Sequence, residues 1–82
     1  MVAAMPRQQL VTIQPEAVRD RREQRGYSQA KLAELSNVSE GFIAHLENGR
    51  RQPGYGNALA IARALGVDLT SIATVHLDPE AA

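Results

Sequence analysis

Few residues of this sequence have the type and spacing that catalysis or metal binding requires. There is no cysteine, which excludes disulfides, thiol catalysis and thiolate zinc sites. The two histidines, His45 and His76, are too far apart to form a local metal-binding motif. Nothing resembles a nucleophile beside a base, or a glycine loop that cradles phosphates. We therefore predict a protein that is not an enzyme and that uses no metal or cofactor.

Polar side chains instead gather around one predicted helix, which Ser39 opens as N-cap and Gly49 ends. Helical spacing over residues 40–48 places an apolar stripe on one face: Ser39, Phe42, Ile43 and Leu46. The opposite face is polar or small: Glu40, Gly41, Ala44, His45 and Asn48. Such a helix can bury one side and offer hydrogen-bonding groups on the other.

If this helix meets DNA, as the resemblance described below implies, its polar face offers suitable groups. Glu40 could accept a hydrogen bond from cytosine, and His45 could donate one to guanine. Arg50 and Arg51 follow the helix directly, where they could contact phosphates or the minor groove. Gly41 weakens a helix but would let the backbone approach the groove closely. Glu40 could instead only favour the first turn of its helix, and the two arginines could simply be solvated.

The helix must be held by other elements of a small protein. The 82 residues suffice for one domain, and the apolar fraction of 44% with few aromatic residues predicts an aliphatic core. We expect helices from Pro15 to about Arg25, over 29–35, over 40–48, over about 57–65 and near 69–73. The fold class is thus all-α, a compact five-helix bundle.

Two flanking segments, residues 10–13 and 74–77, are β-branched and look extended. They could form a short antiparallel ladder within one chain, which we favour, or between two chains. In the first case Leu69 and Ile72 would be freer to meet a second copy. The predicted domain covers residues 10–77, between a flexible N-terminus at 1–9 and a disordered tail at 78–82.

Net charge is zero, with a basic excess over residues 7–52 and an acidic excess over 53–82. This asymmetry permits an anionic partner without requiring one. No apolar run is long enough to span a membrane, and no signal peptide is evident, so we expect a cytoplasmic protein without a membrane role.

The stretch RREQRGYSQAKLAELSNVSEGFIAHLENGRRQP, followed by ARALGVDLTSI, resembles the phage repressor/Cro-type helix-turn-helix regulators, also called the xenobiotic-response-element family. The matching positions are Gly26–Gln29, Leu32-Ala33, Val38-Ser39, Ile43 and Leu46–Gly49. Where the family usually has glycine in the turn, this chain has Asn37, which tolerates a left-handed conformation.

The resemblance implies that helix 40–48 reads the major groove and that Gln29 binds a DNA phosphate. It also implies an ion pair between Arg22 and Glu47. The implied DNA-binding residues are Gln29, Ser39, Glu40, Gly41, Phe42, His45, Asn48, Arg50 and Arg51. Phe42 remains open between core packing and contact with a thymine methyl group. Gln29 could be only a solvated residue, and Asn48 only a helix end.

These residues and the resemblance together indicate a function. We expect a sequence-specific transcriptional regulator, a repressor that binds double-stranded DNA as a homodimer. One alternative is an antitoxin that also binds a toxin and uses DNA binding for its own regulation. Another is a protein-interaction adaptor that does not bind DNA, which the zero net charge and acidic tail keep open.

Overall fold

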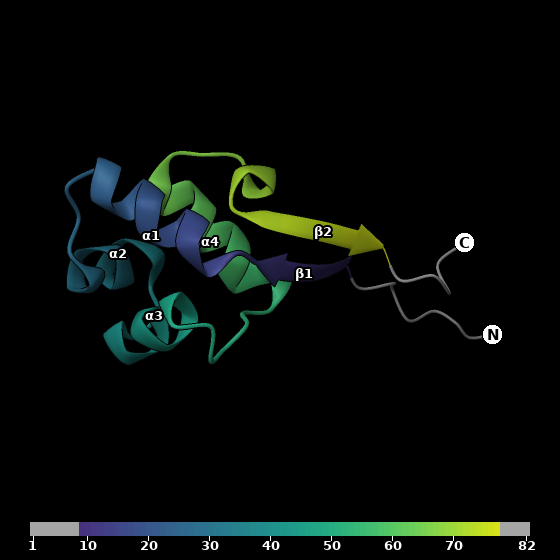
Figure 1. Ribbon diagram of the computed structural model, residues 1–82, viewed down its shortest axis with the longest axis horizontal. Coiled ribbons are helices and arrows are strands. Elements are labelled where there is room, and N and C mark those ends of the chain that lie inside the picture. Colours follow the sequence, from purple (N-terminus) through teal and green to yellow (C-terminus); the bar gives the residue numbers. More distant parts are fainter. Residues whose placement is uncertain (1–8, 78–82) are drawn as a thin grey trace.

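Local signals determine where the helices begin and end in the computed structural model, which describes residues 9–77 (Figure 1). The elements in chain order are β1 (Gln9–Ile13), α1 (Pro15–Gln24), α2 (Gln29–Ser36), α3 (Glu40–Glu47), α4 (Tyr55–Leu65), a 3₁₀ turn η1 (Leu69–Ser71) and β2 (Ala73–Leu77). Pro15 occupies the first turn of α1, where a missing N–H costs nothing. Gly66 ends α4 in a left-handed conformation with φ of 72°. The ends of the helices thus follow from single residues.

The prediction of five helices is wrong, because residues 9–77 contain four α-helices and the 3₁₀ turn η1. The predicted fifth helix near 69–73 stops after Ser71, and Ala73 already belongs to β2. Pairing of Ala73 with Ile13 in the ladder competes with a further helical turn, and the β-branched Thr74 and Val75 favour the strand. The fourth helix also begins at Tyr55, two residues before the predicted start.

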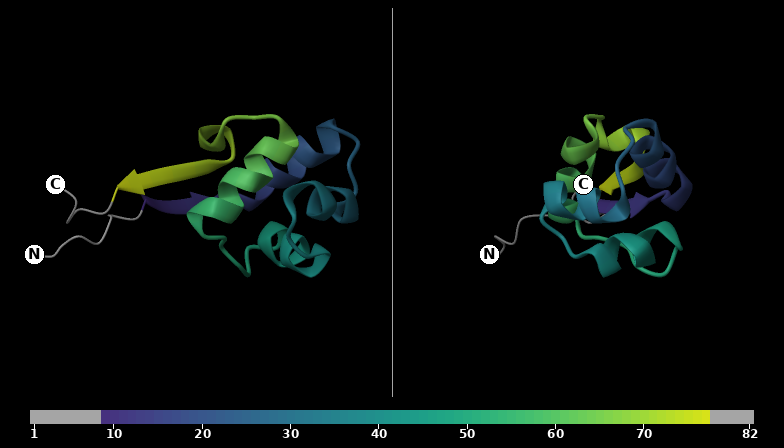
Figure 2. Two further views of the ribbon diagram at one scale, coloured as in Figure 1. Left: turned by 180° about the vertical axis from the view of Figure 1, so that it is seen from behind. Right: turned by 90° about the vertical axis from the view of Figure 1, so that its left-hand side faces the viewer.

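The two strands form an antiparallel ladder within one chain, in agreement with the favoured alternative. Thr12 pairs with Thr74 and Val11 with Val75, and the N–H of Gln14 donates to the carbonyl of Ile72 at 2.9 Å. The ladder projects from one end of the helical body, as the two side views show (Figure 1 and Figure 2, left). β1 begins at Gln9, inside the segment predicted to be flexible; the predictions for residues 1–8 and 78–82 lie outside the described residues.

The core is aliphatic, as the composition predicted. Its buried members come from every element except η1: Ile13, Val18, Leu32, Ala33, Ile43, Leu46, Ala58, Ile61, Ala62, Leu65, Ile72 and Ala73. Ile72 is fully buried and Leu69 packs against the core, so the prediction that these two residues are free to meet a second copy is wrong. The short turn at residues 69–71 directs Ile72 inward, where its burial is favourable.

Candidate nucleic-acid interface

A helix-turn-helix is formed by α2, a three-residue turn and α3. The hydroxyl of Ser28 accepts a hydrogen bond from the N–H of Lys31 at 3.0 Å, which caps α2. Asn37 adopts the left-handed conformation, with φ of 61° and ψ of 38°, and so reverses the chain. The hydroxyl of Ser39 then caps α3 by accepting from the N–H of Phe42 at 3.0 Å. Three polar residues thus set the geometry of the motif.

The faces of α3 divide largely as their spacing predicted, although Ser39 of the apolar stripe is exposed and Ala44 of the opposite face is half-buried. Ile43 and Leu46 are fully buried. On the other side Glu40, Gly41 and His45 are exposed. Asn48 forms the C-terminal cap of α3 and is also exposed, so α3 ends one residue earlier than predicted. The exposed face of α3 therefore offers hydrogen-bonding groups to a ligand.

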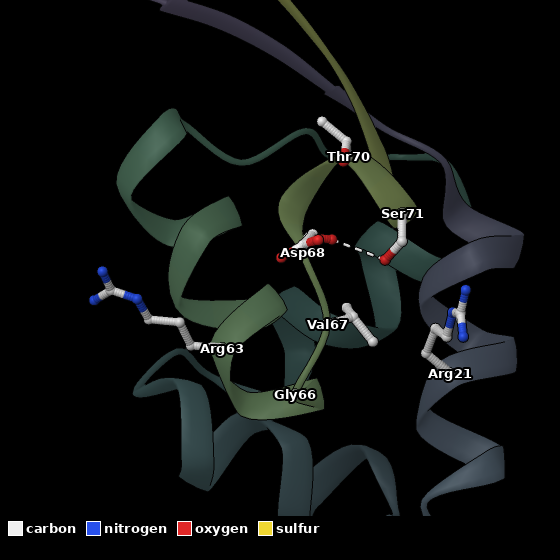
Figure 3. Close-up of a pocket in the computed structure, with 7 residues that line it drawn as sticks. All are labelled: Arg21, Arg63, Gly66, Val67, Asp68, Thr70 and Ser71. Atoms are coloured by element: carbon white, nitrogen blue, oxygen red, sulfur yellow. Dashed lines mark hydrogen bonds between the residues drawn. The ribbon is translucent and has the colours of Figure 1, made fainter.

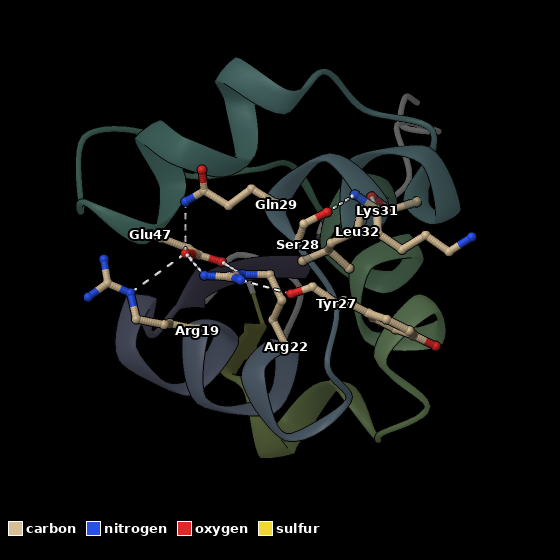
Figure 4. Close-up of polar contacts among 9 residues, drawn as sticks. Arg19, Arg22, Tyr27, Ser28, Gln29, Lys31, Leu32 and Glu47 are labelled. Carbon is tan, nitrogen blue, oxygen red and sulfur yellow. Dashed lines mark hydrogen bonds and ion pairs between the residues drawn. The ribbon is translucent and has the colours of Figure 1, made fainter.

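Arg22 and Glu47 form the ion pair that the resemblance implied (Figure 4). Nε of Arg22 lies 2.7 Å from Oε2 of Glu47, and Nη2 donates to Oε1 at 3.0 Å. Nη1 of Arg22 also donates to the carbonyl of Tyr27 at 2.9 Å. The Glu47 side chain is 0% exposed and the Arg22 side chain 12%. This bidentate pair fixes the end of α3 to α1.

Burial would raise the pKa of the Glu47 carboxyl, but hydrogen bonds from Arg22 and Gln29 and the charges of Arg22 and Arg19 outweigh it. The pKa of Glu47 therefore lies below its usual range. The hydrogen bond to Glu47 likewise raises the pKa of Arg22. Glu47 is thus an ionised, fully partnered carboxylate.

Gln29 lies at the start of α2 and takes part in the same network. Its Nε2 donates to Oε1 of Glu47 at 3.1 Å, which orients the amide toward α3 (Figure 4). An amide nitrogen carries two protons, so one donor remains for another partner. The first N–H groups of α2 also lack partners within the helix. The start of α2 therefore offers an oriented amide together with backbone donors.

The loop after α3 carries the two predicted phosphate-binding arginines, and both are exposed. The Arg51 guanidinium carbon lies 5.6 Å from the centre of the Phe42 ring, a cation–π geometry. Phe42 is half-buried and packs against the core, while one face of its ring meets Arg51. Phe42 is thus partly a core residue, as one of the two open interpretations had it.

Sequence reasoning missed three contacts around this surface. Gln29 binds Glu47, Arg19 approaches Oε1 of Glu47 at 3.7 Å, and Gln52 binds the backbone of Ile13 twice. Spacing along α1 gives no sign that Arg19 and Arg22 share a partner on another helix. For Gln52 the sequence carries no signal, because its partner is the backbone.

Hollows also occur elsewhere on the described residues. One lies between the end of α4, η1 and α1, where Arg21 and Arg63 extend from opposite sides (Figure 3). Its Ser71 hydroxyl is already engaged with the carbonyl of Asp68 at 2.8 Å. Within residues 9–77, no group of three side chains could hold a metal ion. In the same range no helix combines the length and apolar character needed to cross a membrane.

Comparison with known proteins finds similar chains. Residues 18–72 match the model of the HTH_3 family, described as helix-turn-helix. The immunity repressor protein of Bacillus phage phi105 is 35% identical over 51 residues; the match covers 62% of this chain but only 35% of that protein.

Two solved structures resemble the fold. The restriction-modification controller protein C.AhdI of Aeromonas hydrophila is 30% identical, with a TM-score of 0.68 over 70% of this chain and 86% of that one. The P22 c2 repressor, crystallised with a synthetic operator, is 31% identical, with a TM-score of 0.65 over 67% of this chain and 83% of that one.

Proposed function

The chain belongs to the helix-turn-helix family, and on that premise we propose that it is a sequence-specific DNA-binding transcriptional regulator, acting as a repressor. The observation that carries the proposal is the exposed face of α3, with Glu40, Gly41 and His45, flanked by Arg50 and Arg51. The similar P22 c2 protein was crystallised with an operator, and the phi105 protein is an immunity repressor. Both support a repressor role for this chain.

Phosphate contacts position the protein on the duplex. The start of α2 supplies backbone N–H groups and the free amide proton of Gln29, and helix N-termini favour anions. Beyond α3, Asn48, Arg50 and Arg51 supply donors for the backbone of the DNA. The hydroxyl of Ser39 keeps its own proton for a phosphate, because it caps α3 only as an acceptor.

Base contacts come from α3 itself. Glu40 in its first turn can accept from the N4 amine of cytosine, and His45 one turn later can donate to N7 or O6 of guanine. An added Cβ at Gly41 would meet no atom of the described residues within 4 Å, so packing among them does not require glycine there. A close approach of the helix backbone to the groove accounts for it.

Two copies bind each operator in this proposal. One α3 contacts only a few base pairs, so a second copy related by a two-fold axis, with half-sites about one helical turn apart, supplies the remaining specificity.

Selection of bound sequences from random duplex DNA tests the proposal. The parent should enrich a two-fold symmetric site. Glu40→Ala and His45→Ala should each alter the preferred bases, with a loss of about 1–3 kcal/mol on the parent's site. Gln29→Ala should weaken all duplexes alike. If both α3 variants select the parent's sequences, direct readout by these residues is wrong.

Salt dependence tests the phosphate contacts. In the double variant with Arg50→Ala and Arg51→Ala, log K should fall less steeply with log salt. The magnitude of the slope should decrease by about 0.9 for each phosphate that is no longer bound. Unchanged affinity for every duplex would contradict this assignment. A parent that binds no duplex at all would favour the adaptor alternative.

A further inference from the structure

The loop at residues 49–53 is held at two points that the proposed contacts with DNA do not use. It lies within the segment 48–54 that joins α3 to α4, and it carries Arg50 and Arg51. Glycine-flanked loops of this kind are ordinarily mobile, and arginine side chains lose much rotamer freedom when they bind. Anchoring of this loop therefore bears on how strongly the arginines can bind.

The first anchor is the side-chain amide of Gln52. The N–H of Ile13 donates to Oε1 of Gln52 at 2.7 Å, and Nε2 of Gln52 donates to the carbonyl of Ile13 at 3.1 Å. Ile13 ends β1 and pairs with Ala73 of β2 on its other side. The amide thus takes the place that the backbone of a third strand would occupy. The next residue, Pro53, is buried, so the loop is fixed to the body from Gln52 onward.

The second anchor is the ring of Phe42. The Arg51 guanidinium carbon lies 5.6 Å from the ring centre, while the ring itself packs against the core. A half-buried aromatic ring on α3 has a restricted orientation, which gives the guanidinium a fixed platform. Arg51 is adjacent in the chain to Gln52, so the two anchors restrain the backbone and the side chain of the same short segment.

We propose that Gln52 and Phe42 are positioning residues for Arg51, which they hold beside the exposed face of α3 before DNA arrives. This rests on the proposed function for its consequence, because Arg51 is the group that would meet a phosphate. Pre-ordering the side chain lowers the entropy lost on binding. The inference also assigns Phe42 a role as a platform for a cation in place of direct contact with a base.

The first experiment needs no DNA. Protons of the Arg51 side chain near an aromatic face have NMR shifts moved upfield by the ring current. We expect this displacement to vanish in Phe42→Leu and to shrink in Gln52→Leu. Gln24→Leu, the same change at the far end of α1, should leave it as in the parent. An Arg51 displacement unchanged in Gln52→Leu would overturn the role of Gln52.

A second variant at position 52, with the same amide group on a shorter side chain, serves in case Gln52→Leu does not fold. Gln52→Asn retains the amide on a side chain one methylene shorter, so it should also lose the paired hydrogen bonds to Ile13. Thermal melting establishes which variants fold. If Gln52→Leu does not fold, the upfield shift of the Arg51 protons is measured in Gln52→Asn instead. A shift equal to that of the parent would overturn the proposal.

The second experiment measures binding to a mixed-sequence DNA duplex in a double-mutant cycle. Gln52→Leu should weaken binding about 2- to 10-fold, the entropy cost of one freed side chain. In an Arg51→Ala background the same change should have almost no further effect, because Gln52 acts through Arg51. Additive losses would mean that Gln52 contacts DNA or supports the fold, and would overturn the proposal. Absence of binding by the parent would refute the proposed function while the NMR result still decides whether Arg51 is positioned.

Discussion

Glu47 has a fully buried side chain that stays ionised because Arg22, Gln29 and Arg19 surround it. Its carboxylate joins three elements, since Arg22 belongs to α1, Gln29 to α2 and Glu47 itself to α3. A single residue thus couples the orientation of the start of α2 to that of α3. The two surfaces proposed to bind phosphates and bases are held in one geometry.

Removing one partner of this pair should be costly. Arg22→Met leaves the Glu47 carboxylate buried without its main donors, so the free energy of unfolding should fall by about 3–5 kcal/mol. Arg22→Met combined with Glu47→Leu should cost much less, because neither charge is then stranded. Denaturation in urea measures both. Lys31→Ala provides a control, since its contact with Glu34 is exposed and is worth at most about 1 kcal/mol. Equal losses for the single and the double variant would contradict the argument.

Protonation of the Glu47 carboxylate should lower the free energy of unfolding in acid. Its pKa is lower in the folded chain than in the unfolded chain, so its contribution is complete above the unfolded value of 4.5 and is lost as pH falls through the folded value. Unfolding free energies of the parent and of Glu47→Gln should therefore differ most near pH 7 and converge as the pH falls below about 4.5. A difference that is constant with pH would show that ionisation of Glu47 does not stabilise the fold.

Substitution of Gly41 should affect stability and DNA binding in opposite directions. It lies in α3 with open space around the position of a Cβ, so Gly41→Ala should raise the free energy of unfolding by about 1 kcal/mol. If the helix backbone approaches the groove closely, the same variant should bind the selected operator more weakly. Thermal melting and a binding titration on one sample check both; unchanged binding would show that glycine at this position has no role in DNA contact.

At the scale of elements, the turn between α2 and α3 depends on one backbone conformation. Asn37 is the only non-glycine residue with positive φ among residues 9–77, at the position where the resemblance led us to expect glycine. The side chain of asparagine tolerates this region, whereas a β-branched side chain does not. The angle between the two helices of the motif follows from this residue.

Substitutions at Asn37 should therefore differ sharply in their effect on stability. Asn37→Gly should leave the melting temperature nearly unchanged, because glycine adopts positive φ freely. Asn37→Val should lower the free energy of unfolding by about 1–2 kcal/mol or more, the approximate cost of the left-handed conformation. Thermal or urea unfolding distinguishes them. A valine variant as stable as the parent would mean that the turn can change its conformation without cost.

At the scale of the whole molecule, the ladder closes the fold by joining the two ends of the described chain. Ile13 and Ala73 at its base belong to the core, and Gln52 binds the outer side of β1. Two strands alone are marginally stable in water, so the helical body must support this ladder. In return, the ladder buries core residues that neither end could bury alone.

Deletion of residues 74–82 should lower the melting temperature, because β1 loses its partner strand. A loss of about 1 kcal/mol corresponds to about 4–8 °C in a domain of this size. Deletion of 78–82 alone leaves β2 intact and serves as the control. Sedimentation should show the same oligomeric state for all three chains, since the ladder forms within one chain. Melting temperatures that are equal in all three would show that the ladder contributes nothing.

The sequence by itself determined the features that depend on neighbours along the chain. Caps such as Ser28 and Ser39, the left-handed turn at Asn37 and the division of α3 into buried and exposed faces all follow from local spacing. The same is true of the two extended flanks. The ion pair of Arg22 with Glu47 was predicted only through the family resemblance, because the two residues meet across helices.

Only the tertiary structure decided what depends on groups distant in the chain. Burial of Ile72 and pairing of Ala73 with Ile13 end the segment that local signals favoured as a fifth helix. The contact of Gln52 with the Ile13 backbone has no sequence signature, because every residue except proline offers the same N–H and carbonyl. Local free energies are small, so where a strand or a core position competes for the same residues, the long-range contact prevails.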